Sequence, residues 1–123
     1  MILRRILAGC LARLHLVERP DFLVVTSMDM PAPNELKPGT AIVVGPKQTS
    51  KWVTFQCPSG CGTPLLLSLN PQRRPRWTVA SDWLGRPTLT PSIRRADGCR
   101  CHFWIRKGRV EWCKDSGKIL PEN

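Results

Sequence analysis

Two short cysteine-containing segments hold the residues best suited to chemistry. In the first, Cys57 and Cys61 enclose a Pro-Ser-Gly turn. In the second, Cys99, Cys101 and His102 lie within four consecutive residues. Zinc in proteins takes four ligands in a tetrahedron, drawn mainly from cysteine sulfur and histidine nitrogen. A small domain buries a limited core, so a metal crosslink would add stability that burial alone does not supply. The two segments therefore predict a zinc site.

The expected ligands of this zinc are four cysteines, Cys57, Cys61, Cys99 and Cys101. The fourth ligand is open to alternatives, because His102 adjoins Cys101 and Cys113 is expected to lie across a hairpin from His102. A site filled by cysteine leaves no position for water or substrate, which indicates a structural zinc and makes a catalytic zinc hydrolase the weaker interpretation. Free buried cysteines, or one disulfide, are the interpretation without a metal.

The composition indicates a single, strand-rich domain with a strong positive charge. The chain has 123 residues with 12 prolines, 9 glycines and no tyrosine, which favours short strands and turns over long helices. Its formal net charge is +10. A charge of this size favours an acidic partner, which could be nucleic acid, an anionic membrane surface or an acidic protein.

The N-terminus does not resemble a complete secretion signal. Residues 7–10, Leu-Ala-Gly-Cys, are similar to a lipidation box, but the apolar stretch before them is too short for a signal peptide. No run of residues approaches the length of a transmembrane segment. A reducing cytoplasm with metal-bound thiolates is therefore the expected setting of the six cysteines.

The chain divides into three expected parts. Residues 1–20 form a basic amphipathic helical segment that Pro20 ends, residues 21–113 form the zinc-stabilised β domain, and residues 114–123 form a polar tail. The predicted fold class is mostly β: a small zinc-stabilised antiparallel domain with zinc-ribbon-like knuckles and an N-terminal helix. The helix could bind a membrane surface or a partner, or dock on its own domain.

Alternating apolar residues and turn signals predict the strands. They are expected at 22–26, 40–44, 52–56, 65–69, 77–80, 88–90, 102–106 and 109–113, with Pro91 interrupting the sixth. The last two strands flank the two-residue turn Lys107-Gly108, a hairpin whose length sets the register. This register places Phe103 and Ile105 on the core face, with His102 opposite Cys113 on the other face.

The chain also resembles a small bacterial family encoded in ubiquitination-like (Bub) operons, the BubE-like serine peptidases or transpeptidases. The resemblance covers about three-quarters of the chain, from Glu35 to Cys113. It rests on motifs that recur in order, namely Asn34-Glu35-Leu36-Lys37-Pro38-Gly39, Cys57-Pro58-Ser59-Gly60-Cys61-Gly62, Arg76-Trp77-Thr78, Leu89-Thr90-Pro91-Ser92-Ile93, Gly98-Cys99-Arg100-Cys101-His102-Phe103-Trp104-Ile105 and Gly108-Arg109-Val110-Glu111-Trp112-Cys113. The chain departs from the family at two positions: the family often has cysteine where Ser59 stands and serine where Cys101 stands.

The resemblance implies processing of the operon's ubiquitin-like protein in the bacterial cytoplasm, beside E1-like and E2-like partners. It implies a serine nucleophile at Ser92. A serine hydroxyl needs a base within hydrogen-bond reach, and His102 is the natural candidate. If His102 is that base, the fourth zinc ligand is a cysteine, most simply Cys101. If His102 binds zinc instead, Ser92 needs another activator.

A non-catalytic binding module is the alternative function. A zinc-ribbon-like domain could dock nucleic acid or an acidic protein through the basic loop at 73–76 and through tryptophans that lie among basic residues. Cys113 opposite His102 could also form a thiolate–imidazole pair, although an inert thiol or a zinc ligand is the simpler interpretation.

Overall fold

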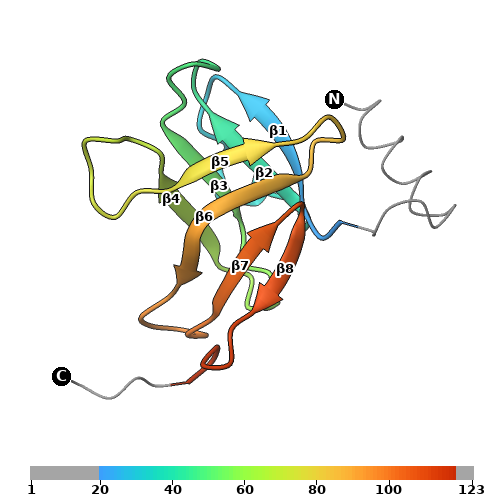
Figure 1. Cartoon of the computed structure of the whole chain (residues 1–123), viewed down its shortest axis with the longest axis vertical. Coiled ribbons are helices and arrows are strands. Elements are labelled where there is room, and N and C mark those ends of the chain that lie inside the picture. The colour runs from blue at the N-terminus through green and yellow to red at the C-terminus, as the bar shows by residue number, and fades with distance from the viewer. Residues whose placement is uncertain (1–19, 119–123) are drawn as a thin grey trace, which may run out of the picture.

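The computed structural model describes residues 20–118, so the predicted N-terminal helix and the end of the predicted tail lie outside the described residues. Nearly all regular structure in this range is strand (Figure 1). The elements are β1 (Leu23–Ser27), the 3-10 turn η1 (Pro33–Glu35), β2 (Thr40–Val44), β3 (Trp52–Gln56), β4 (Pro64–Ser68), β5 (Thr78–Ser81), β6 (Pro87–Arg94), β7 (His102–Arg106) and β8 (Arg109–Trp112). The mostly β prediction is confirmed. In this range the chain forms no helix that is long and apolar enough to cross a membrane.

The first sheet has the strand order β1-β2-β3-β4. Its β2–β3 and β3–β4 pairs are antiparallel, as expected, but β1 pairs with β2 in parallel. An entirely antiparallel domain was therefore the wrong prediction. Residues 28–39, which include η1, connect the two parallel strands. A connection of this length can carry the chain back to the starting end of the sheet, which a tight turn cannot do.

The second sheet has the order β5-β6-β7-β8 and is antiparallel throughout. Strand β6 continues through Pro91 to Arg94, so the predicted interruption at Pro91 is wrong. The β6–β7 pairing instead shifts register between Leu89 and Ile93. Proline has no N–H group to give to a ladder, so a bulge accommodates it without ending the strand.

The β7–β8 hairpin has the predicted register. Phe103 pairs with Trp112 and Ile105 with Val110, and the N–H of Cys113 donates to the carbonyl of His102 at 3.0 Å. Phe103 and Ile105 are fully buried, whereas the alternate residue His102 is only partly so. The period of two along a strand thus separates a core face from a face that is free for chemistry.

The two sheets share one core, which contains buried residues of β2, β3, β4, β6 and β7. At its centre Phe55 of β3 contacts Phe103 of β7, with ring centroids 6.5 Å apart, and Phe22 contacts Phe55 at 5.1 Å, both edge to face. Aromatic pairs in this arrangement add attraction beyond the burial of apolar area. The core therefore joins one sheet to the other.

A backbone contact at Gly108 also ties the tip of the β7–β8 hairpin to the start of the first sheet. The carbonyl of Gly108 accepts the N–H groups of Asp21 and Phe22 at 2.7 and 2.8 Å, and its own N–H donates to Pro87 at 2.7 Å. Gly108 has a positive φ of 77°, and an added Cβ would lie 2.7 Å from the carbonyl oxygen of Phe22. Only glycine fits this position without moving the backbone.

We therefore expect Gly108→Ala to destabilise the domain more than Gly117→Ala. Gly117 has a similar φ of 81°, but nothing lies within 4 Å of its added Cβ. Both variants carry the cost of a left-handed residue, about 1–2 kcal/mol. Gly108→Ala must also displace backbone, which adds about 1–3 kcal/mol. Urea unfolding of both variants measures the difference, and equal midpoints would contradict the tight contact.

Candidate active site and metal centre

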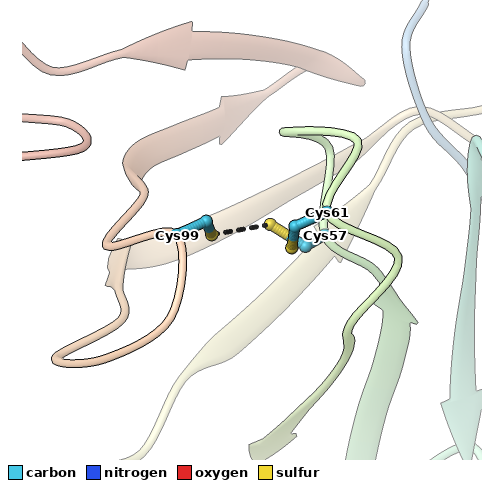
Figure 2. A group of neighbouring side chains, drawn as sticks. All are labelled: Cys57, Cys61 and Cys99. Carbon is cyan, nitrogen blue, oxygen red and sulfur yellow. Dashed lines mark hydrogen bonds between the residues drawn. The ribbon is translucent and has the colours of Figure 1, made fainter.

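Three cysteine sulfurs converge between the β3–β4 turn and the loop that precedes β7. The ligand atoms of Cys57, Cys61 and Cys99 all lie within 4.8 Å of one another, and Figure 2 shows the Cys99 side chain facing the other two. The turn is held by its own backbone, since the N–H of Cys57 donates to the carbonyl of Thr63 at 2.9 Å. Two segments that are distant in sequence therefore present their thiols to one point.

Cys101 and Ser59 both adjoin this cluster through Cys57. The sulfur of Cys101 lies 3.5 Å from that of Cys57, and the hydroxyl oxygen of Ser59 lies 3.0 Å from the same atom. Cys101 is not among the three mutually close sulfurs, so it must move closer to complete a tetrahedron. The two positions at which the chain departs from the family pattern thus face one sulfur atom, where either could supply a ligand.

The electrostatic environment divides the cysteines into two kinds. A hydrogen bond from Ser59 lowers the pKa of the Cys99 thiol and, with help from Thr63, lowers the pKa of Cys61 to about 5. Burial raises the pKa of Cys57 and also of Cys101, which is 1% exposed. Cys61, which is exposed, and Cys99, which is partly buried, therefore ionise more readily than the buried Cys57 and Cys101, whose thiolates a bound cation would favour.

The four cysteines can hold a metal ion. Zinc–sulfur bonds of about 2.3 Å in a tetrahedron separate the sulfurs by about 3.8 Å. The Cys57–Cys99 and Cys57–Cys101 sulfur distances are 3.7 and 3.5 Å. The guanidinium of Arg95 lies 3.8 Å from the sulfurs of both Cys61 and Cys99, where it offsets the negative charge of a four-thiolate site. The donor set fits zinc, and the two sulfur distances from Cys57 are close to those of a tetrahedral site.

His102 and Cys113 lie in a different group. Their ligand atoms and a carboxylate oxygen of Asp115 lie within 4.8 Å of one another, apart from the cluster of Cys57, Cys61 and Cys99. Of the three residues considered for the fourth metal position, Cys101 alone contacts that cluster directly. The other two belong with the residues around Ser92.

Ser92 and His102 are hydrogen-bonded to each other. The Oγ of Ser92 lies 3.0 Å from Nε2 of His102, and the other ring nitrogen, Nδ1, lies 2.6 Å from Oδ1 of Asp115. The carboxylate can only accept, so Nδ1 carries the proton and donates it to Asp115. In the neutral ring, Nε2 then has a free lone pair and accepts the hydroxyl proton of Ser92. This is the arrangement of nucleophile, base and orienting acid that activates a serine.

Arg94 completes the surroundings of Asp115. Its guanidinium forms an ion pair with Oδ2 of Asp115 and lies 2.8 Å from Nδ1 of His102. Nδ1 cannot accept a hydrogen bond from Arg94 while it donates one to Asp115. Its contact with the charged carboxylate of Asp115 is the shorter of the two, so we assign Nδ1 as the donor to Asp115. The hydrogen bond from His102, followed by the contact with Arg94, lowers the pKa of Asp115, so this group stays ionised in mildly acidic solution.

Strand alternation explains how the sequence places these side chains. In β6, Ile93 is buried in the core, while Ser92 and Arg94 project to the other face, where Arg94 pairs in register with His102. Ser92 lies in the stretch where the β6–β7 register shifts. The indole N–H of Trp77 also donates to the carbonyl oxygen of Ser92 at 3.3 Å. Bulges next to active sites commonly redirect a side chain in this way.

Asp115 is the residue that sequence reasoning missed, because it lies in the expected polar tail. The described part of that segment folds back on the sheet: the Oγ of Ser116 accepts the N–H of His102 at 3.0 Å, and the N–H of Gly117 donates to Arg100 at 2.8 Å. The sequence signal that could have revealed this turn is Gly117, which follows a cluster of polar residues. In the structure Gly117 has a positive φ of 81°. Gly in such a cluster indicates a turn rather than an extended tail.

Comparison with known proteins identifies a matching family. The model of the family described as bacterial ubiquitination-like system serine protease (BubE) matches residues 28–113, well over half of the chain. No curated protein and no solved structure matches. The match contains Ser92, His102 and all the cysteines of the cluster, and it ends two residues before Asp115. The chain therefore belongs to the BubE family of serine proteases of bacterial ubiquitination-like systems.

Proposed function

We propose that this protein is a serine peptidase or transpeptidase that processes a bacterial ubiquitin-like protein, with Ser92 as nucleophile, His102 as base and Asp115 as the residue that orients the base. The observation that carries the proposal is the continuous chain of hydrogen bonds from Ser92 Oγ through the His102 ring to Asp115, at 3.0 and 2.6 Å. The family to which the chain belongs supports the reaction class.

The reaction follows from the protonation states of this chain of residues. Ser92 Oγ attacks a peptide carbonyl and forms a bond to its carbon while its proton moves to Nε2 of His102. The imidazolium, stabilised by Asp115, then gives that proton to the departing amine, which leaves an acyl group on Ser92. Water completes hydrolysis, whereas a second amine completes transpeptidation, and His102 accepts the proton of either attacking group.

Zinc on Cys57, Cys61, Cys99 and Cys101 is the proposed cofactor, with a structural role. A four-cysteine site has no free position for a substrate, and bound zinc would supply a rigid crosslink. This crosslink would fix Cys101, and with it the backbone of the adjacent His102. The N–H of Arg95, which follows the β6 segment carrying Ser92, donates to the carbonyl of Cys101 at 2.9 Å, so the same crosslink would steady both strands of the site.

The proposed partners are the ubiquitin-like substrate and the E1-like and E2-like proteins of the same system, in the bacterial cytoplasm. The net charge of +10 favours an acidic surface on the substrate. The alternative of a nucleic-acid-binding module has less support. Of Trp77, Trp83 and Trp104, which could stack on bases, Trp104 has the guanidinium of Arg106 over its ring and Trp77 is partly buried, which leaves Trp83 as the exposed one.

Activation of Ser92 can be tested without knowing the substrate. A fluorophosphonate probe reacts with serines whose proton is removed by a base, and we expect it to label Ser92 in the wild-type protein. Ser92→Ala should abolish labelling and lower cleavage of a tail-extended ubiquitin-like protein by on the order of 10⁴-fold or more. Ser81→Ala, which changes an exposed serine of β5, is the matched control. Labelling that persists in Ser92→Ala, mapped by mass spectrometry, would reject this nucleophile.

The role of Asp115 predicts that Asp115→Asn folds normally but loses activity. An asparagine amide can donate to Nδ1, which stabilises the ring tautomer that has its proton on Nε2 and cannot accept from Ser92. Activity should fall by on the order of 10³–10⁴-fold, measured as kcat at constant thermal stability. Asp29→Asn, at an exposed aspartate in the loop after β1, should have no effect. Equal activity of the two variants would remove Asp115 from the mechanism.

The metal proposal predicts one zinc per chain in protein purified without added metal. Cys101→Ser should lose it, whereas His102→Ala and Cys113→Ser should keep it. Because Ser59 and Cys101 both face Cys57, the double variant Ser59→Cys/Cys101→Ser should regain zinc. Elemental analysis measures the zinc content of each protein. If His102→Ala loses zinc and Cys101→Ser retains it, the fourth ligand is His102 and not Cys101.

A further inference from the structure

A second group of metal-binding side chains lies at the proposed catalytic site itself. It comprises His102, Cys113 and Asp115, whose ligand atoms all lie within 4.8 Å of one another. All three are partly buried, and the His102 side chain is 17% exposed. Nothing in the proposed reaction uses Cys113, although its N–H donates to the carbonyl of His102 at 3.0 Å and so fixes it beside the base.

The chemistry of these donors suits zinc. Imidazole nitrogen, thiolate sulfur and carboxylate oxygen are the three kinds of ligand that zinc takes, and three protein ligands with water in the fourth position make a complete coordination shell. Binding would release the thiol proton of Cys113 to solvent. All three residues are only partly buried, so the ion could enter and leave.

We propose that this group is a reversible inhibitory zinc site, which switches off the peptidase when free zinc rises. The inference rests on the proposed function of Ser92 and His102. Zinc on Nε2 would replace the hydrogen bond from Ser92, which is 3.0 Å long. Zinc on Nδ1 would force the remaining ring proton onto Nε2, which could then no longer accept. With either nitrogen as ligand, His102 ceases to be a base.

Arg94 sets the strength of this site. Its guanidinium pairs with Oδ2 of Asp115 and lies 2.8 Å from Nδ1 of His102, so an arriving cation must displace it. The Arg94 side chain is 33% exposed and has room to turn toward solvent. Zinc therefore binds here more weakly than at a four-thiolate cluster, as a site that responds to free zinc requires.

The test compares the wild type with Cys113→Ser, which removes one zinc ligand and leaves Ser92, His102 and Asp115 in place. After dialysis against buffered free zinc, the wild type should hold one more zinc per chain than the variant. Zinc should also protect wild-type Cys113 from iodoacetamide, as measured by peptide mass spectrometry. The zinc concentration that half-inhibits cleavage should rise by more than about tenfold in Cys113→Ser, since even loss of an outer-shell partner costs that much affinity.

Each outcome separates the inhibitory site from the proposed function. Equal zinc content in the two proteins, with no protection of Cys113, would overturn the site. Inhibition at the same zinc concentration in both would also overturn it. If the wild type binds the extra zinc and protects Cys113 but neither cleaves a substrate nor reacts with a fluorophosphonate, the metal site stands and the peptidase proposal fails.

Discussion

The alternation of side chains at the start of β7 is the constraint on which both chemical sites depend. Cys101 and His102 are neighbours in the chain, yet Cys101 is buried beside Cys57 while His102 contacts Ser92 on the other face. Because successive residues of an extended chain point to opposite sides, one peptide unit belongs to both the cysteine cluster and the serine site. Whatever fixes Cys101 therefore also fixes the backbone of His102.

The serine site is assembled from three segments that the second sheet brings together. Ser92 comes from the irregular part of β6, His102 from the start of β7 and Asp115 from the turn after β8. The order serine, histidine, aspartate along the chain matters little, because the same constellation occurs in several orders on unrelated folds. The hydrogen bond from His102 and the ion pair with Arg94 both favour Asp115 as a carboxylate, which keeps the proton of His102 on Nδ1.

Local sequence signals accounted for the parts of the fold that short-range geometry controls. The strands at 40–44, 52–56 and 102–106 have their predicted bounds, and the two-residue turn at Lys107-Gly108 fixes the hairpin register as expected. Local signals failed at Pro91, because a proline ends a strand only where no bulge accommodates it. They failed again at β1, since the direction of a pairing depends on the path of the connecting loop.

The sequence by itself determined the types and rough positions of the chemical groups: the cysteine knuckles, the serine after Pro91 and a histidine within reach along a strand. Only the tertiary structure decided which groups meet. Cys101 rather than His102 or Cys113 contacts the cysteine cluster, and Asp115 folds back from an apparent tail to His102. The physical reason is that a ligand set or a chain of hydrogen bonds depends on the distances between segments. Sheet pairing and core packing set these distances, and the spacing of residues along the chain does not encode them.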